Sequence, residues 1–125
     1  MADSDFPRPL SKLERDVITA LLSVPASWAQ ELRDQIDSAV VTRAWGSKSP
    51  SIDLSVDVLR SRAEIAEGPL PLTATVASDE GELVGELLLW TENGRLSALE
   101  YAWYTDEPPE SLPDPGRICV SPERN

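Results

Sequence analysis

The sequence contains no histidine among its 125 residues. Histidine is the commonest general base near neutral pH and the commonest metal ligand in proteins. Its absence excludes Ser-His and Cys-His catalytic pairs and every metal site built on imidazole. The sequence also lacks the glycine-rich motifs of nucleotide-binding proteins and the oxygen-rich loop that binds calcium. We therefore predict a protein that is not an enzyme and that uses no metal or other cofactor.

Cysteine and long apolar runs are also scarce. Cys119 is the only cysteine, so the chain cannot form an internal disulfide, which fits a reducing compartment. No apolar run approaches the roughly 18 to 20 residues needed to cross a bilayer, and the first residues lack the pattern of a signal peptide. These absences predict a soluble, cytoplasmic protein with no membrane partner.

Negative charge is abundant and unevenly distributed. The formal net charge is −11, and residues 79–114 hold ten acidic residues and a single basic one, Arg95. Nucleic-acid binding depends on Lys and Arg contacts to phosphates, so a nucleic-acid partner is not expected. A basic protein is the natural electrostatic complement of such a segment. The alternative is that the charge serves solubility alone.

The length of the chain predicts one domain, because 125 residues suffice for one hydrophobic core and leave no room for a second. Residues 1–9 contain two prolines and no periodic pattern, which predicts a disordered lead-in. Residues 10–115 are expected to form a single α+β domain. Residues 116–125 are expected to form a flexible C-terminal tail.

Two helices are predicted near the N-terminus. Ser11 with Glu14, and Ser27 with Gln30, each match a capping box, and apolar residues at helical spacing follow both pairs. About four residues separate the two helices, which favours an αα-hairpin.

From residue 40 onward the apolar period changes to two, which predicts strands at 41–45, 52–58 and 72–76. We expect the helical hairpin to pack on an antiparallel sheet of about four or five strands, in which the last three form a meander. An extended, proline-rich segment follows, and residues 59–70 give no clear pattern.

The strongest local signal is Asn93-Gly94 between two apolar runs, which predicts a type I′ hairpin turn. A two-residue loop then fixes the cross-strand pairs. The expected pairs include Glu92 with Arg95, Trp90 with Ser97, Leu87 with Glu100, Glu86 with Tyr101 and Val84 with Trp103. This register places Trp90, Tyr101 and Trp103 on one face and Glu86 and Glu100 on opposite faces.

These residues suggest a binding surface, since Trp and Tyr supply much of the energy at protein interfaces. The alternative for the aromatic residues is packing in the core, and the alternative for the acidic residues is a solvated tail. Trp28 and Trp45 are expected to be structural. The predicted partner-binding residues are Glu86, Trp90, Tyr101, Trp103, Asp106, Glu107, Glu110 and Asp114.

The order of Leu10–Val17, Leu32–Ile36, Gly85–Tyr101 and Tyr104–Pro109 resembles that of small uncharacterised bacterial proteins with helices followed by a sheet. In size, acidity and layout the chain is also similar, more weakly, to immunity proteins of bacterial toxin systems. The latter resemblance implies a non-enzymatic inhibitor of a basic toxin. The alternatives are a homodimeric structural protein and a domain that binds a small molecule or acts as a carboxylate-dependent enzyme through Glu86 or Glu100.

Overall fold

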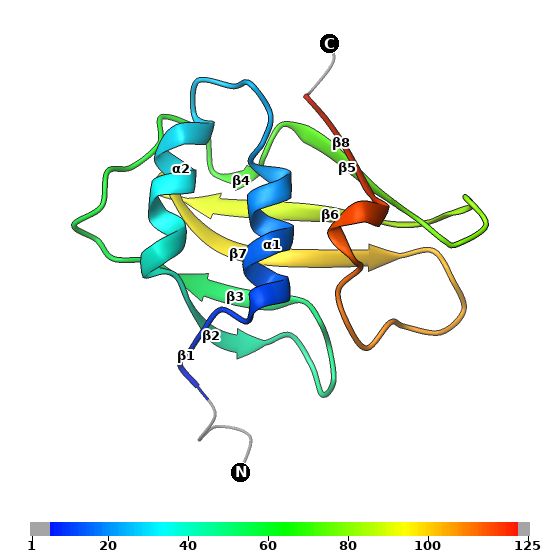
Figure 1. The fold of residues 1–125 in the computed structure, drawn as a ribbon. Helices are drawn as coiled ribbons and strands as arrows, with labels where there is room; N and C mark the ends of the chain where they lie inside the picture. The colour runs from blue at the N-terminus through cyan, green and yellow to red at the C-terminus, as the bar shows by residue number, and fades with distance from the viewer. Residues whose placement is uncertain (1–5, 123–125) are drawn as a thin grey trace.

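The computed structural model describes residues 6–122, which form an α+β fold of two short helices and an open antiparallel sheet of eight strands (Figure 1). The α-helices are α1 (Lys12–Leu21) and α2 (Ala29–Gln35), and two 3-10 turns are η2 (Ile36–Ser38) and η3 (Pro115–Arg117). The strands are β1 (Arg8–Pro9), β2 (Val40–Ala44), β3 (Ile52–Ser55), β4 (Gly68–Pro69), β5 (Leu72–Ala77), β6 (Leu83–Glu92), β7 (Arg95–Trp103) and β8 (Ile118–Pro122).

The start of α1 confirms the capping box predicted at Ser11. The Ser11 hydroxyl accepts the N–H of Glu14 at 3.1 Å, and the Glu14 carboxylate accepts the N–H of Ser11 at 2.8 Å. The second predicted box is absent. Helix α2 begins at Ala29, after Trp28, and has no side-chain cap. Trp28 packs against the core, so its contacts rather than a serine cap accompany the start of this helix.

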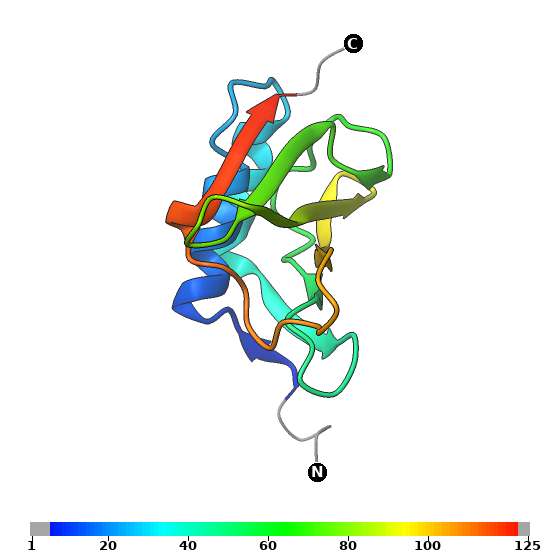
Figure 2. The same cartoon turned by 90° about the vertical axis from the view of Figure 1, so that its right-hand side faces the viewer.

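Both helices lie on the same side of the sheet, as Figures 1 and 2 show. The core fills the space between these two layers. Its largest fully buried side chains include Leu21 of α1, Leu32 of α2 and Leu89 and Leu99 of the sheet. We call this side of the sheet the covered face, and the opposite side the open face.

The strands follow the order β1-β2-β3-β7-β6-β5-β8, and β4 pairs with β6 beyond the end of β5. Strands β5, β6 and β7 are consecutive antiparallel neighbours, as the meander requires. The sheet holds more strands than the four or five expected, because several very short strands extend it.

Two of the added strands lie where the sequence predicts irregular ends. Arg8–Pro9 pairs with β2, within the predicted lead-in, whose residues 1–5 lie outside the described part of the chain. Ile118–Pro122 pairs with β5 along its length, so the prediction of a flexible tail is wrong there. Ile118 and Val120 alternate and pack against the core. Two alternating apolar residues are too few to predict a strand from the sequence. Residues 123–125 lie outside the described part.

The β6–β7 hairpin has the predicted turn but not the predicted register. Asn93 and Gly94 both have positive φ, at 55° and 73°, and Glu92 pairs with Arg95. Between Trp90 and Thr91 the pairing shifts, because Ser97 is an extra residue on β7. Every later pair therefore differs by one residue from the expected one.

The position of the bulge has a physical reason in the sequence. Leu96 and Leu99 are three residues apart, so an unbroken strand would point them to opposite faces. The bulge lets both enter the core, where they are only 2% and 0% exposed. It also reverses the face of the residues that follow. Leu87 now pairs with Tyr101, and Gly85 pairs with Trp103.

Candidate binding site on the open face

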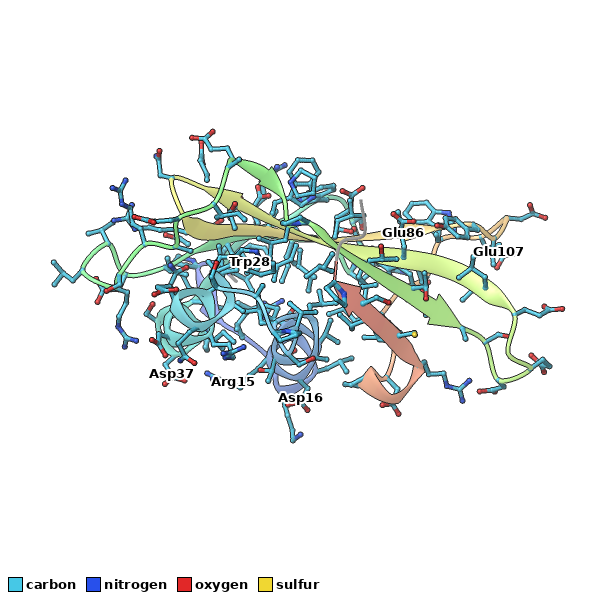
Figure 3. The ribbon with its side chains drawn as sticks, turned by 90° about the horizontal axis from the view of Figure 1, so that it is seen from above. Arg15, Asp16, Trp28, Asp37, Glu86 and Glu107 are labelled. Atoms are coloured by element: carbon cyan, nitrogen blue, oxygen red, sulfur yellow. The ribbon has the colours of Figure 1, made fainter. Side chains whose placement is uncertain are left out.

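The open face is the side of the sheet without helices. In Figure 3, Glu86 projects from it, whereas Arg15 and Asp37 lie on the helical layer at the other side. The bulge brings Trp90, Glu86 and Glu100 together on this face, since Glu100 pairs with Leu88 between them. The prediction that the two glutamates point to opposite faces is therefore wrong.

Three aromatic side chains on or beside this face each donate a hydrogen bond to a carboxylate. The pairs are Trp90 Nε1 with Glu100 Oε1 at 3.1 Å, Tyr104 Oη with Glu86 Oε1 at 2.5 Å, and Trp45 Nε1 with Asp53 Oδ1 at 2.9 Å. We call these the three aromatic–carboxylate pairs. Each bond fixes the orientation of a ring and of an acidic group at the same time.

The charge of these pairs is only partly balanced. Asp53 forms an ion pair with Arg43 at 2.8 Å. Within residues 6–122, neither Glu86 nor Glu100 forms an ion pair with a basic side chain. The hydrogen bond to Glu86, together with burial and the negative charge of Glu86, raises the pKa of the Tyr104 phenol, so this phenol stays protonated and keeps donating.

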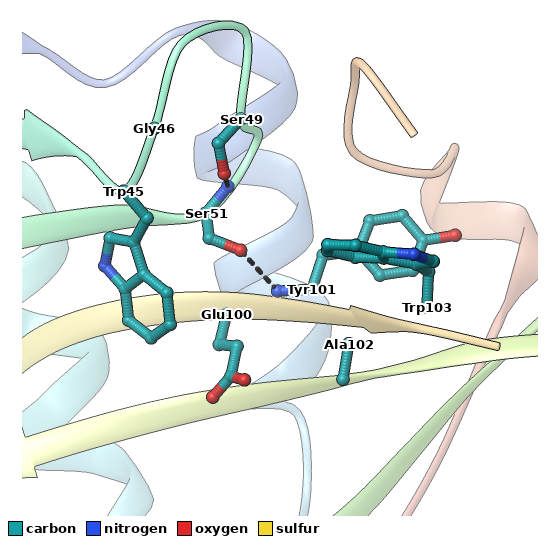
Figure 4. Close-up of a pocket in the computed structure, with 8 residues that line it drawn as sticks. All are labelled: Trp45, Gly46, Ser49, Ser51, Glu100, Tyr101, Ala102 and Trp103. Atoms are coloured by element: carbon teal, nitrogen blue, oxygen red, sulfur yellow. Dashed lines mark hydrogen bonds between the residues drawn. The ribbon is translucent and has the colours of Figure 1, made fainter. Parts of the chain in front are cut away.

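Two hollows share Trp45: the first lies at the edge of β7, beyond the end of β3, and the second lies on the open face. The first has a volume of about 500 Å³ and lies between Trp45 and Trp103, with Glu100 at its border (Figure 4). The second has a volume of about 480 Å³ and is lined by Trp45, Trp90 and Asp53, among others. We call the first one the tryptophan pocket. Each hollow is large enough to hold a side chain of another molecule.

The predicted aromatic stripe is divided by the bulge. Trp90 lies on the open face, whereas Tyr101 points into the core and is 7% exposed. Burial raises the pKa of the Tyr101 phenol. The ring needs the space above Gly85, where an added Cβ would come within 2.8 Å of Tyr101 Cε1. Trp103 lies on the same side of β7 as Tyr101, but at the end of the strand it is 44% exposed and lines the tryptophan pocket.

The predicted carboxylate row is shorter than expected. Asp106, Glu107 and Glu110 are exposed on the segment between β7 and η3. Asp114 has a structural role instead, because its carboxylate accepts the N–H of Gly116 at 3.1 Å and caps η3. Leu112, which is buried in the core, anchors the segment between these acidic residues.

Trp45 is a surface residue, in contrast to the expectation that it is structural. Trp45 is 41% exposed and stands on the open face beside Asp53 rather than in the core. The alternation of residues along β2 and β3 could have indicated this position, because Arg43 pairs with Asp53 and alternate residues of a strand share a face. That signal depends on knowing where the intervening loop ends.

Comparisons of the chain with models of protein families, with curated proteins and with solved structures found no match. No helix in the described part of the chain is long and apolar enough to cross a membrane. Among residues 6–122, no three acidic or cysteine side chains are grouped so that they could hold a metal ion. The residues of the open face are therefore the basis for a proposal on function.

Proposed function

We propose that this protein is a non-enzymatic binding module that presents its open face to a basic protein partner, most concretely as an immunity-type inhibitor of a basic toxin. One observation carries the proposal. The three aromatic–carboxylate pairs hold large rings and negative charges in fixed positions, on a sheet face that no helix covers.

The aromatic residues of these pairs supply the contact area. Trp and Tyr are enriched among the residues that dominate binding energy, because they bury much apolar surface and lose little conformational freedom. Here each ring is already oriented by its hydrogen bond to a carboxylate, which reduces the entropy lost on binding.

The carboxylates supply selectivity for positive charge. Glu86 and Glu100 form no ion pair with a basic side chain among the described residues, and the chain as a whole carries −11. Such a field accelerates encounter with a basic protein and repels acidic ones. It is screened beyond about 10 Å at 0.1 M salt, so association should weaken as salt rises.

The same charge argues against the homodimer alternative. A two-fold interface places the same patch of both copies together. Joining two open faces would bring Glu86 and Glu100 of one copy against those of the other, and like charges at an interface are unfavourable. A basic partner relieves this repulsion, whereas a second copy of the chain adds to it.

Affinity capture from the host tests the proposal. The bait is the full chain, captured at low and then at high salt, beside a double variant Trp90→Ala, Glu100→Gln and a control variant Glu31→Gln on α2. We expect one basic protein that is retained at low salt, reduced at high salt and lost with the double variant only. Recovery of no basic protein at either salt concentration would overturn the proposal, as would equal loss with the control.

A further inference from the structure

The tryptophan pocket lies where β3 stops short of its neighbour. Ile52, the first residue of β3, pairs with Leu99, and β7 continues to Trp103. The loop that precedes β3 borders the pocket instead. Its Ser51 hydroxyl accepts the N–H of Tyr101 at 2.9 Å, which fixes the loop to β7 (Figure 4).

The walls of the pocket are two indole rings. Trp45 and Trp103 stand on either side of it in Figure 4. Trp45 is held by its hydrogen bond to Asp53, so its ring is oriented before any ligand arrives. Both rings are partly exposed, which leaves their π faces available for contact.

The border of the pocket carries one charge. Glu100 Oε1 accepts the hydrogen bond from Trp90 Nε1, and within the described residues Oε2 has no hydrogen-bond donor. None of the eight residues that line the pocket is basic. The C=O of Tyr101 adds a second acceptor at this edge of β7, because the N–H and C=O of one strand residue point toward the same neighbouring strand and this N–H points to Ser51.

We propose that the tryptophan pocket binds the guanidinium group of an arginine side chain from the partner. A guanidinium is planar and weakly hydrated, so it stacks on indole faces while it donates to a carboxylate. An anion would be repelled by Glu100, and an apolar side chain would supply no donor to Glu100 Oε2. This inference rests on the proposed function and names the group that the partner inserts.

The test uses a small probe rather than the partner. N-acetyl-arginine amide is titrated into the full chain, and the N–H signals of the four tryptophan indoles are followed by NMR. We expect the Trp45 and Trp103 signals to shift with saturation in the millimolar range and the Trp28 signal to stay unchanged. N-acetyl-citrulline amide has the same shape without the charge and should shift none of them.

Two variants locate the binding. Glu100→Gln keeps an acceptor for Trp90 but removes the charge, and should weaken arginine binding about tenfold. Glu80→Gln makes the same change on an exposed carboxylate outside the pocket and should leave binding unchanged. Equal binding of arginine and citrulline would overturn the inference, as would shifts that Glu100→Gln does not reduce.

A further variant separates this inference from the proposed function. Trp103→Leu removes one wall of the pocket and leaves the Trp90–Glu100 pair in place; a thermal melt checks its fold. Loss of both arginine binding and partner capture supports the pocket. A partner that still binds Trp103→Leu but not the Trp90→Ala, Glu100→Gln variant shows that the open face binds it without the pocket.

Discussion

The two faces of the β6–β7 hairpin differ in burial and in chemistry. On the covered face, Leu87 and Leu89 of β6 are almost completely buried. The residues that alternate with them, Glu86, Leu88 and Trp90, lie on the open face and are only partly buried. Adjacent residues of one strand therefore serve different purposes. The covered face provides stability, whereas the open face can carry charge and aromatic groups at little cost in stability.

The largest expected effect comes from the covered side, at Gln35. Its amide is fully buried, donates to the C=O of Ser61 and of Gly94, and accepts the N–H of Leu96, each at 3.0 Å. Gln35→Leu leaves the C=O of Ser61 and the N–H of Leu96 without this partner, and the C=O of Gly94 keeps only the N–H of Ala63. The loss should cost about 4 kcal/mol of unfolding free energy, measured in urea. Gln30→Leu, at an exposed site, should change it by less than about 0.5 kcal/mol. A loss below about 1 kcal/mol in Gln35→Leu would contradict this account.

Two neighbouring leucines of β6 allow the contributions of the two faces to stability to be compared. Leu89→Ala opens a cavity under the helices and should cost about 3 kcal/mol. Leu88→Ala, one residue earlier and on the open face, should cost less than about 1 kcal/mol. Urea denaturation of the two variants beside the unmodified protein measures both losses. Similar losses in the two variants would mean that something covers the open face.

The contribution of Glu14 to the stability of the fold depends on pH. Burial alone would raise the pKa of Glu14, but hydrogen bonds from Arg8 and Ser11 outweigh it and the pKa is lowered. The stabilisation is therefore complete above the unfolded-state pKa of about 4.3 and is lost as pH falls through the lower folded-state pKa.

Glu14→Gln tests this dependence. The variant should lose about 1 kcal/mol at pH 7, and its difference from the unmodified protein should shrink as the pH drops below about 4. Thermal melts between neutral and acidic pH measure it. Glu82→Gln, at an exposed carboxylate, is the matched control. A difference that stays constant with pH would show that the Glu14 charge contributes nothing.

The smallest effect on stability is expected on the open face. Trp90→Phe keeps an aromatic ring but removes the donor to Glu100, and should cost only about 0.5 kcal/mol. Trp28→Phe, on the side where the core lies, should cost more because a packed ring becomes smaller. Chemical denaturation ranks the two. A larger loss at Trp90 would make the open face structural.

Local features of the fold could be predicted because few neighbouring residues decide them. The capping box at Ser11 and the positive φ angles at Asn93 and Gly94 depend on the chemistry of three or four residues. The bulge at Ser97 could not be predicted in this way. It depends on which leucines the helices bury, and helices and strand are far apart in the sequence.

That single shift accounts for most of the difference between the predicted and the observed candidate binding site. One extra residue in β7 moved Tyr101 into the core and brought Glu100 onto the same face as Glu86. Trp45 joined them only through the pairing of β2, β3 and β7. The acidic and aromatic composition of the region could be predicted, but the pairs that these residues form could not.

Four properties can be read from composition or from a few neighbouring residues: the absence of imidazole, the excess of negative charge, the cap of α1 and the hairpin turn at Asn93-Gly94. Which acidic and aromatic side chains meet depends on the tertiary structure, because burial of Leu96 and Leu99 beneath the helices sets the register of β7. The face on which each later residue of β7 lies follows from that register.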